Sequence, residues 1–392
     1  MINKFNPRKM KGLRIIDKFL SVFFHCRKNT EELDFVKIRE IIIVDFSAIG
    51  DIVQLTSFIK VLKTNMPFAT ISIVCEEWAK DILEDQNLID HFYFFRGDLL
   101  LRNPFDWILN YSLIKKVIQS INVKNYDLAI EPKGDLRFIF FMNFIKGKKK
   151  VSYNYTGGKS FLTDSVMPSP NQEHYVEEKL YLLEAIGCKI NSNDKYPKLE
   201  LSKADIAYNE LFLIENDLQN KFMIGIHPGS SAANKQWHYF GKLAKMLYQY
   251  YGKQIAFLIF EGPKEEEASY KIVKELLKVG ATYILVKEKL KLYIKRLALC
   301  QLVICNDSGA GHIAAAYKIP VVSIFGATNP DNFKPYGNGI VSVISHDYPC
   351  KPCLSTSCLL GYPKCLQEIY VTEVLNEIKR LALIDLKVIQ EI

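Results

Sequence analysis

The chain is predicted to be an α/β protein that contains two doubly wound parallel sheets in tandem. Short, β-branched apolar runs alternate with helical stretches, and the alternation restarts once, at "KFMIGIHPGSS" (221–231). A length of 392 residues is enough for two domains. Strands that alternate with helices favour a parallel sheet. Ligands bind such sheets beyond the carboxyl ends of the strands, so the loops there are the candidate sites.

The composition indicates a globular protein with acidic partners. The net charge of +8 favours nucleotides, phosphorylated lipids or an anionic membrane surface. No basic stripe is interleaved with aromatic residues, so no nucleic-acid partner is expected. The longest apolar stretch, "FIFFMNFI", is far shorter than the roughly 18–20 residues of a membrane span. No convincing secretory signal is found, so a cytoplasmic protein is expected.

The first residues predict a basic amphipathic helix over 8–27. Its apolar face carries Leu13, Ile16, Leu20 and Phe23 at helical spacing. Two readings stay open: the helix packs on the first domain, or it lies on an anionic membrane surface.

The strands follow in order along the chain. "IIIVDF" (41–46) is a buried-strand pattern, followed by a turn, "SAIGD", and by a helix from Ile52. Further strands are expected at 70–75, 126–132, 221–226, 254–260, 281–286, 302–307 and 320–326. The expected organisation is an N-terminal extension over 1–37, a first domain over 38–200, a connecting helix over 201–220, a second domain over 221–348, and a cysteine-rich segment with a C-terminal helix over 349–392.

The stretch "LVICNDSGAGHIAAA" takes a strand into a helix. Asp307 or Ser308 is expected to cap that helix. Two glycines, Gly309 and Gly311, allow a close backbone approach to a ligand, and the free N–H groups of the first turn form an anion site. His312 lies in that turn, where it can donate to a phosphate oxygen. The alternative is a capped helix whose glycines serve tight packing.

A second loop, "HPGSSAANKQW", also follows a strand of the second domain. Ser230, Ser231 and nearby amides can hold phosphate oxygens, and Lys235 can neutralise a diphosphate. Trp237 either shapes the cleft or anchors the core.

The third loop, "SAIGD", contains Asp51. This carboxylate either caps the helix or faces the cleft as a general base. A helix N-terminus keeps a carboxylate ionised and makes it a weaker base. Such a base suits a reaction with a good leaving group, and a nucleotide diphosphate is one.

Together these loops resemble glycosyltransferase family nine, the bacterial heptosyltransferases of lipopolysaccharide core synthesis. "IIIVDFSAIGDIVQLTSFIKVLK" is similar to that family's opening strand, S-x-x-G-D loop and helix. "HPGSSAANKQW" is similar to its phosphate loop. "NDSGAGHIAAAYKIPVVSIFGATNP" is similar to its D-T-G-x-x-H-x-A-A motif and G-x-T-x-P turn. The resemblance implies a GT-B fold of two Rossmann-like domains facing across a cleft, with a C-terminal helix (372–383) suited to return to the first domain.

The resemblance implies an inverting transfer of heptose from ADP-heptose to a phosphorylated glycolipid, either the lipopolysaccharide core or a related surface glycan. No cofactor is implied for catalysis. Asp51 would be the base, and Lys235 with Ser230 and Ser231 would stabilise the diphosphate. The residues implied to grip the diphosphate and donor sugar are Asp307, Ser308, Gly309, Gly311 and His312. Glu265 or Glu267 would hold the ribose.

The acceptor side is less defined. Lys133 and Arg137 of "EPKGDLR" are expected to face the acceptor, and "KGKKK" (146–150) is either a solvated basic turn or a contact for acceptor phosphates. A place on the cytoplasmic face of the inner membrane, as a peripheral protein, would suit such an acceptor.

Four cysteines lie close together in the sequence, and their role stays open. A structural zinc or iron, disulfides, and reduced packing thiols are the three alternatives, because C-x-x-C is half of a metal motif while the second half has unusual spacing. These residues are Cys350, Cys353, Cys358 and Cys365.

Two other functions remain as alternatives. A GT-B sugar-nucleotide epimerase would act on the donor without an acceptor. A catalytically idle relative would bind a nucleotide or recruit partners through the cysteine-rich segment.

Overall fold

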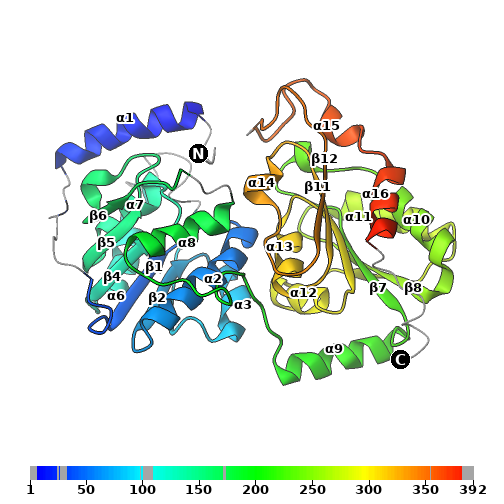
Figure 1. Ribbon diagram of the computed structural model, residues 1–392, viewed down its shortest axis with the longest axis horizontal. Helices are drawn as coiled ribbons and strands as arrows, with labels where there is room; N and C mark the ends of the chain where they lie inside the picture. The colour runs from blue at the N-terminus through cyan, green and yellow to red at the C-terminus, as the bar shows by residue number, and fades with distance from the viewer. Residues whose placement is uncertain are drawn as a thin grey trace. The chain divides into compact units, whose positions relative to one another are not determined.

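The computed structural model describes residues 7–23, 26, 33–97, 99, 109–170, 174–353 and 355–381. The chain divides into two compact units, Met1–Lys195 and Tyr196–Ile392. Each is built on one six-stranded parallel sheet (Figure 1). The strand orders are β3-β2-β1-β4-β5-β6 and β12-β11-β10-β7-β8-β9. Both follow the doubly wound order, so the predicted fold class is confirmed.

The first unit places helices on both faces of its sheet. Helix α8 packs beside α2 on one face, while side chains of α6 and α7 fill the core on the other. The elements of this unit are α1 (Pro7–Phe23), β1 (Glu40–Val44), α2 (Ile49–Asn65), β2 (Thr70–Cys75), α3 (Lys80–Leu83), β3 (His91–Phe94), α6 (Tyr111–Ile121), β4 (Tyr126–Glu131), α7 (Leu136–Asn143), β5 (Gly147–Tyr153), β6 (Asp164–Val166) and α8 (Tyr175–Ala185).

Helix α1 packs on this first unit, as one of its two readings expected. Leu13, Ile16 and Leu20 contact the core that α6 and α7 form. The Asp17 carboxylate accepts the Gly158 backbone N–H at 2.8 Å, so the turn with the sequence "GGKS" anchors α1. None of the described helices has both the length and the apolar character needed to cross a membrane.

Strand β5 corrects the reading of "KGKKK" as a basic turn or phosphate contact. Lys149 and Lys150 are buried within this strand. Their ammonium groups reach Asp164, at 3.5 Å, and the Asn143 carbonyl oxygen, at 2.6 Å. The aliphatic parts of these lysine side chains can be buried because each ammonium group has a partner. The run of charged residues therefore did not indicate a strand in the sequence.

The second unit repeats the plan of the first. Helices α10, α11 and α16 gather on one face of its sheet (Figure 1). The elements of this unit are α9 (Lys203–Glu215), β7 (Phe222–His227), α10 (Phe240–Tyr251), β8 (Ile255–Phe260), α11 (Glu266–Leu277), β9 (Tyr283–Val286), α12 (Leu290–Leu297), β10 (Leu302–Asn306), α13 (Gly309–Ala316), β11 (Val321–Phe325), α14 (Pro330–Phe333), β12 (Val341–Ser345), α15 (Lys364–Gln367) and α16 (Val371–Arg380).

The C-terminal helix differs from expectation. Val374, Leu375 and Ile378 of α16 are buried in the core of the second unit, with α10 side chains such as Leu243 and Leu247. Over its described length α16 therefore belongs to the second unit rather than returning to the first. An apolar stripe on a C-terminal helix predicts that the helix packs, but not on which sheet.

Candidate active site

A buried asparagine joins the two candidate loops of the second unit. Asn306, at the end of β10, donates from Nδ2 to the Pro228 carbonyl oxygen at 2.7 Å. Its Oδ1 accepts the Trp237 backbone N–H at 3.0 Å. The Trp237 indole is 2% exposed and donates to the Ile369 carbonyl oxygen, so this residue is the core anchor. The loops after β7 and β10 are therefore held together.

Lys235 and Asp307 meet where these loops adjoin. The Lys235 ammonium lies 2.6 Å from Asp307 Oδ2, and the Thr328 hydroxyl donates to the same oxygen at 2.6 Å. The Asp307 side chain is 9% exposed and the Lys235 side chain is 20% exposed, so the carboxylate is buried while the ammonium stays partly open. A partly buried ammonium beside a helix N-terminus is suited to stabilise negative charge that develops on a ligand.

Helix α13 begins at Gly309 without a side-chain cap. Ser308 is the N-cap residue by its backbone, but its hydroxyl makes no capping hydrogen bond. The Asp307 carboxylate is directed to Lys235 and Thr328 instead. The expected cap is therefore wrong, and the first-turn N–H groups are available to an anion. His312 is half-buried on this turn.

Gly311 is closely packed. A Cβ atom there would lie 2.9 Å from Pro335 Cγ and 3.0 Å from Cys305 Sγ. These contacts favour the packing alternative, and a backbone contact of Gly311 with the donor stays a prediction.

The serines of the β7 loop differ in environment. Ser230 donates its hydroxyl to the Ala232 carbonyl oxygen at 2.7 Å, whereas Ser231 is exposed. Beside Lys235, Asn234 is buried and donates to the Ser355 carbonyl oxygen at 2.8 Å. The cysteine-rich segment thus supports the turn that carries Lys235.

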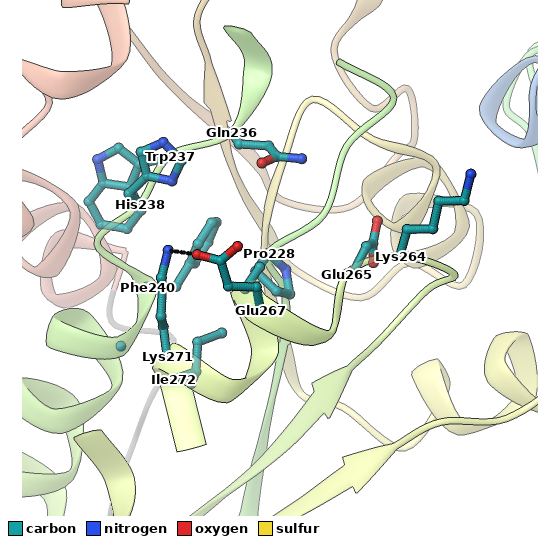
Figure 2. Close-up of a pocket in the computed structure, with 12 residues that line it drawn as sticks. Pro228, Gln236, Trp237, His238, Phe240, Lys264, Glu265, Glu267, Lys271 and Ile272 are labelled. Atoms are coloured by element: carbon teal, nitrogen blue, oxygen red, sulfur yellow. Dashed lines mark ion pairs between the residues drawn. The ribbon is translucent and has the colours of Figure 1, made fainter. Parts of the chain in front are cut away.

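Glu265 and Glu267 have different surroundings. The Glu265 carboxylate lies over Gly229, where an added Cβ would come within 1.7 Å of it, and it accepts the Gly262 N–H at 2.7 Å. The Glu267 carboxylate pairs with Lys271 at 2.7 Å and is 84% exposed. Figure 2 shows Glu265 directed away from that ion pair, at a cavity of about 190 Å³. Only Glu265 is packed against the β7 loop.

His227, at the end of β7, is a site residue that the sequence did not suggest. It is 8% exposed, and its Nδ1 lies 2.9 Å from the Tyr293 hydroxyl and 3.8 Å from Glu265 Oε2. Burial lowers the pKa of His227, against the opposing influence of Glu265. A neutral imidazole beside the glutamate adds no charge to the site.

In the first unit, Asp51 lies in the first turn of α2, which begins at Ile49, three residues before the predicted start. Its Oδ2 accepts the Ala48 N–H at 3.3 Å, which satisfies one backbone donor at the start of the helix. The same oxygen lies 3.7 Å from the Lys133 ammonium. The side chain is 21% exposed, so one carboxylate both caps the helix and remains partly open to solvent.

Lys133 reaches Asp51 from the loop after β4. Its ammonium donates to the Ser47 hydroxyl at 3.1 Å. Burial alone would lower the pKa of Lys133, but Asp51 and the neighbouring carboxylates outweigh burial and raise it. Lys133 is therefore a permanent cation beside Asp51.

Two further side chains complete these surroundings. Buried Lys179 of α8 donates to the Asp51 carbonyl oxygen at 2.9 Å, and burial lowers its pKa. Arg137 is held by Asp135, with its Nε 2.8 Å from Oδ1. The structure thus brings Lys133 to Asp51, whereas Arg137 binds the residue that caps α7.

Several of these partners escaped the sequence analysis. Buried Asp45, whose Oδ1 accepts the Ser47 backbone N–H at 2.9 Å, interrupts an apolar strand run, which is a signal for a buried polar role. Thr328 belongs to the quoted "GATNP" turn. Neither Lys179 nor Glu131, whose Oε1 accepts the Lys133 backbone N–H at 3.2 Å, carries such a signal, since a charged residue at the end of a strand or on a helix is commonly exposed.

The four clustered cysteines are free thiols; Cys350 is exposed and the other three are partly buried. Burial raises the pKa of Cys365, Lys351 lowers it, and the other three thiols add to the increase. In the described part of the chain, no three His, Cys, Asp or Glu side chains are arranged to hold a metal ion. A zinc or iron centre, one of the three alternatives that the sequence leaves open, is not assembled by the described residues.

Comparisons with known proteins identify the family of the chain. The profile of glycosyltransferase family 9 (heptosyltransferase) matches residues 114–362. Lipooligosaccharide heptosyltransferase 2 of Campylobacter jejuni is 30% identical over 217 residues, 54% of this chain and 65% of that protein. The matched region thus spans just under two thirds of that curated relative.

Solved structures share the fold over nearly their whole length. Escherichia coli ADP-heptose lipopolysaccharide heptosyltransferase II superimposes with a TM-score of 0.70 at 21% identity, covering 88% of this chain and 98% of that one. A family 9 glycosyltransferase from Veillonella parvula gives 0.75 at 22% identity, covering 91% and 99%. The two units are thus Rossmann-like domains of the GT-B type, and the chain belongs to glycosyltransferase family 9, the heptosyltransferase family.

Proposed function

We propose that this chain is an inverting glycosyltransferase that transfers heptose from ADP-heptose to a phosphorylated sugar of the lipopolysaccharide core or a related glycolipid. The observation that carries the proposal is the Lys235–Asp307–Thr328 cluster beside the uncapped start of α13. A diphosphate needs concentrated positive charge, and an ammonium next to free helical N–H groups supplies it. The donor named for the similar Escherichia coli enzyme, ADP-heptose, contains such a diphosphate.

The proposed chemistry is a single displacement. Asp51 accepts the proton of the acceptor hydroxyl as that oxygen attacks the anomeric carbon of the heptose. The bond from this carbon to the diphosphate oxygen breaks, and its electrons remain on ADP. Lys235 and the α13 N–H groups stabilise the charge that develops there. Attack from the face opposite the leaving group inverts the anomeric centre.

The remaining donor contacts follow from position. Ser230, Ser231 and Ser308 offer hydroxyls, and His312 offers a ring N–H, to the diphosphate and sugar. Gly309 supplies a first-turn backbone N–H. For the ribose hydroxyls we favour Glu265 over Glu267, because the Glu265 carboxylate lies over Gly229 of the β7 loop, whereas the Glu267 side chain is 84% exposed and pairs with Lys271.

On the acceptor side, Lys133 is the proposed contact for an anionic group. Its pKa is raised, so it carries charge at any working pH. Arg137 is proposed as a weaker contact, because Asp135 already engages its guanidinium.

Calorimetry with a panel of sugar nucleotides tests the donor site. ADP-heptose should bind in preference to UDP- and GDP-sugars, and His312→Ala should weaken binding about tenfold through loss of a charge-assisted hydrogen bond. Glu265→Gln should weaken it as well, with Glu267→Gln as the matched control that leaves it unchanged. Preference for another nucleotide would overturn the donor. Product formed from ADP-heptose without an acceptor would favour an epimerase.

We further propose that α1 attaches the protein to an anionic membrane, where a lipid-linked acceptor would lie. Beside the face that packs on the first unit, α1 carries a second apolar face of Ile15, Phe19 and Val22, which are 71%, 65% and 70% exposed. Arg14 and Lys18 flank it and are also exposed. Basic residues beside exposed apolar ones are typical of helices that lie in a lipid interface.

Co-sedimentation with vesicles tests this attachment. Binding to vesicles that contain anionic lipid should fall about tenfold in a Phe19→Ser variant, because an inserted aromatic side chain is lost. Lys115→Ser, at an exposed lysine on α6, is the control. Equal binding of wild type and Phe19→Ser would contradict the proposal.

A further inference from the structure

Glu131 is a fully buried carboxyl group at the end of β4, beside the proposed base but not in contact with it. Its Oε1 accepts the Lys133 N–H at 3.2 Å. Its Oε2 accepts the Gly134 N–H at 2.6 Å and the Ser152 hydroxyl at 2.6 Å. One side chain therefore binds two successive backbone N–H groups of the loop after β4.

These hydrogen bonds fold the loop around the carboxyl group. Gly134 has a φ of +75°, in the left-handed region that glycine tolerates best. A Cβ atom there would lie 2.5 Å from the Tyr155 ring, so the loop has little room to move. The fold of this loop determines where the Lys133 side chain begins.

The end of that side chain lies at Asp51. The Lys133 ammonium is 3.1 Å from the Ser47 hydroxyl and 3.7 Å from Asp51 Oδ2. No described hydrogen bond joins Glu131 to Asp51, so its influence on Asp51 passes through the loop and Lys133.

We propose that Glu131 is a positioning residue that holds Lys133 beside Asp51, so that one loop sets both the orientation of the base and the cation offered to the acceptor. This rests on the proposed function of Asp51. It goes beyond that function in assigning a task to a carboxyl group that no substrate reaches.

The opposite end of the same strand offers a matched control. Asp127, also on β4, accepts the backbone N–H groups of Arg39 and Glu40, at 2.8 and 3.2 Å, and pairs with Lys148 at 2.8 Å. Like Glu131, Asp127 uses its carboxylate to hold backbone N–H groups of a neighbouring segment. In a parallel sheet it lies at the amino edge, away from Asp51, so a purely structural effect should appear at both positions and a positioning effect only at Glu131.

Glu131→Gln is the test variant. In either orientation of the amide, its NH₂ group faces at least one N–H or O–H donor that the carboxyl group now satisfies. The loop should then open, and exchange of the Gly134 amide proton should accelerate about tenfold. This readout needs no substrate. If Glu131→Gln does not fold, Gly134→Ala displaces the same loop by steric overlap and leaves the buried carboxyl group in place.

Kinetics complete the test, with ADP-heptose as donor and lipopolysaccharide from a strain lacking this protein as acceptor. Glu131→Gln should lower kcat about tenfold, while the calorimetric Kd for ADP stays at the wild-type value. Lys133→Met should lower kcat similarly. The double variant should be no worse than Lys133→Met alone, because both changes remove one interaction. Asp127→Asn should keep kcat within about twofold, even where it lowers stability.

Three results would overturn the positioning role: unchanged exchange at Gly134, an unchanged kcat in Glu131→Gln or Gly134→Ala, or additive losses in the double variant. A wild-type protein with no transferase activity would instead overturn the proposed function. The exchange experiment would still report whether Glu131 holds the loop, so the two failures are distinguishable.

Discussion

The two units place an aspartate and a lysine at corresponding points of their sheets, with the two residue types exchanged. In the first unit the aspartate follows β1 and the lysine follows β4, its neighbour in the sheet. In the second unit the lysine follows β7 and the aspartate follows β10. The first pair is separated by 3.7 Å and the second by 2.6 Å.

The difference in separation suggests different tasks. Asp307 Oδ2 is engaged by both the Lys235 ammonium and the Thr328 hydroxyl. Asp51 meets Lys133 loosely and is partly exposed, so a substrate hydroxyl can reach it. One topology thus builds a closed pair suited to hold charge and an open pair suited to move a proton.

The largest expected effect tests the open pair. Asp51→Asn should lower kcat about a thousandfold, because a general base is lost, while the Kd for ADP does not change. Initial rates and calorimetry measure the two quantities, and Asp127→Asn again serves as the control. If the affinity for ADP fell in parallel with kcat, Asp51 would contribute to nucleotide binding. The two pairs would then not have the different tasks inferred from their geometry.

Removing the lysine of the closed pair should give a second signature. Lys235→Met should lower kcat about a hundredfold through loss of charge stabilisation, and it should also weaken ADP binding. Lys242→Met removes an exposed lysine on α10 and is the matched control. Undiminished ADP affinity would argue that Lys235 does not contact the diphosphate.

A smaller change should loosen the closed pair without removing it. Thr328→Val deletes the hydroxyl that donates to Asp307 and should reduce kcat/KM about tenfold. Thr328→Ser keeps the hydroxyl and should recover most of this loss. Equal rates for the valine and serine variants would show that the third member of the cluster has no role.

The last prediction concerns stability rather than catalysis, and it compares two buried glutamates whose pKa values shift in opposite directions. Burial raises the pKa of Glu131 to about 8, against the Ser152 hydrogen bond. Burial would also raise the pKa of Glu261, but hydrogen bonds from Lys287 and Ser269 outweigh it and lower that pKa.

The signs of the two contributions follow from linkage. Glu131 holds an extra proton in the native state, so its contribution is complete below the unfolded pKa near 4.5 and is lost as pH rises through about 8. The slope approaches about 1.4 kcal/mol per pH unit. Glu261 contributes above the unfolded pKa, and this contribution is lost as pH falls through its lowered value.

Urea unfolding across pH 3–9 separates the two contributions. Glu131→Gln should remove the decline between pH 5 and 8, and Glu261→Gln should flatten the acid limb. An unchanged slope in Glu131→Gln would mean that the group is already ionised at neutral pH.

The parts of the site that the sequence predicted are those that topology determines. Asp51, Lys235 and Asp307 each follow a readable apolar strand, and parallel pairing brings such loops to one edge. The misses arise where side chains are satisfied by tertiary contacts. The sequence predicts a solvated turn at the lysines of β5, because it does not show that Asp164 and the Asn143 carbonyl oxygen bind their ammonium groups. The close packing of Gly311 against Pro335 is likewise a tertiary contact that the sequence does not show.

The tight Lys235–Asp307 pair has a consequence for turnover. In the proposed donor site, an arriving diphosphate must compete with Asp307 for the Lys235 ammonium, so part of the attraction between ammonium and diphosphate is cancelled before binding begins. The same competitor remains when the sugar has left, and it favours dissociation of the nucleoside diphosphate. The Asp307 carboxylate thereby lowers the affinity for the donor and raises the rate at which the nucleoside diphosphate dissociates.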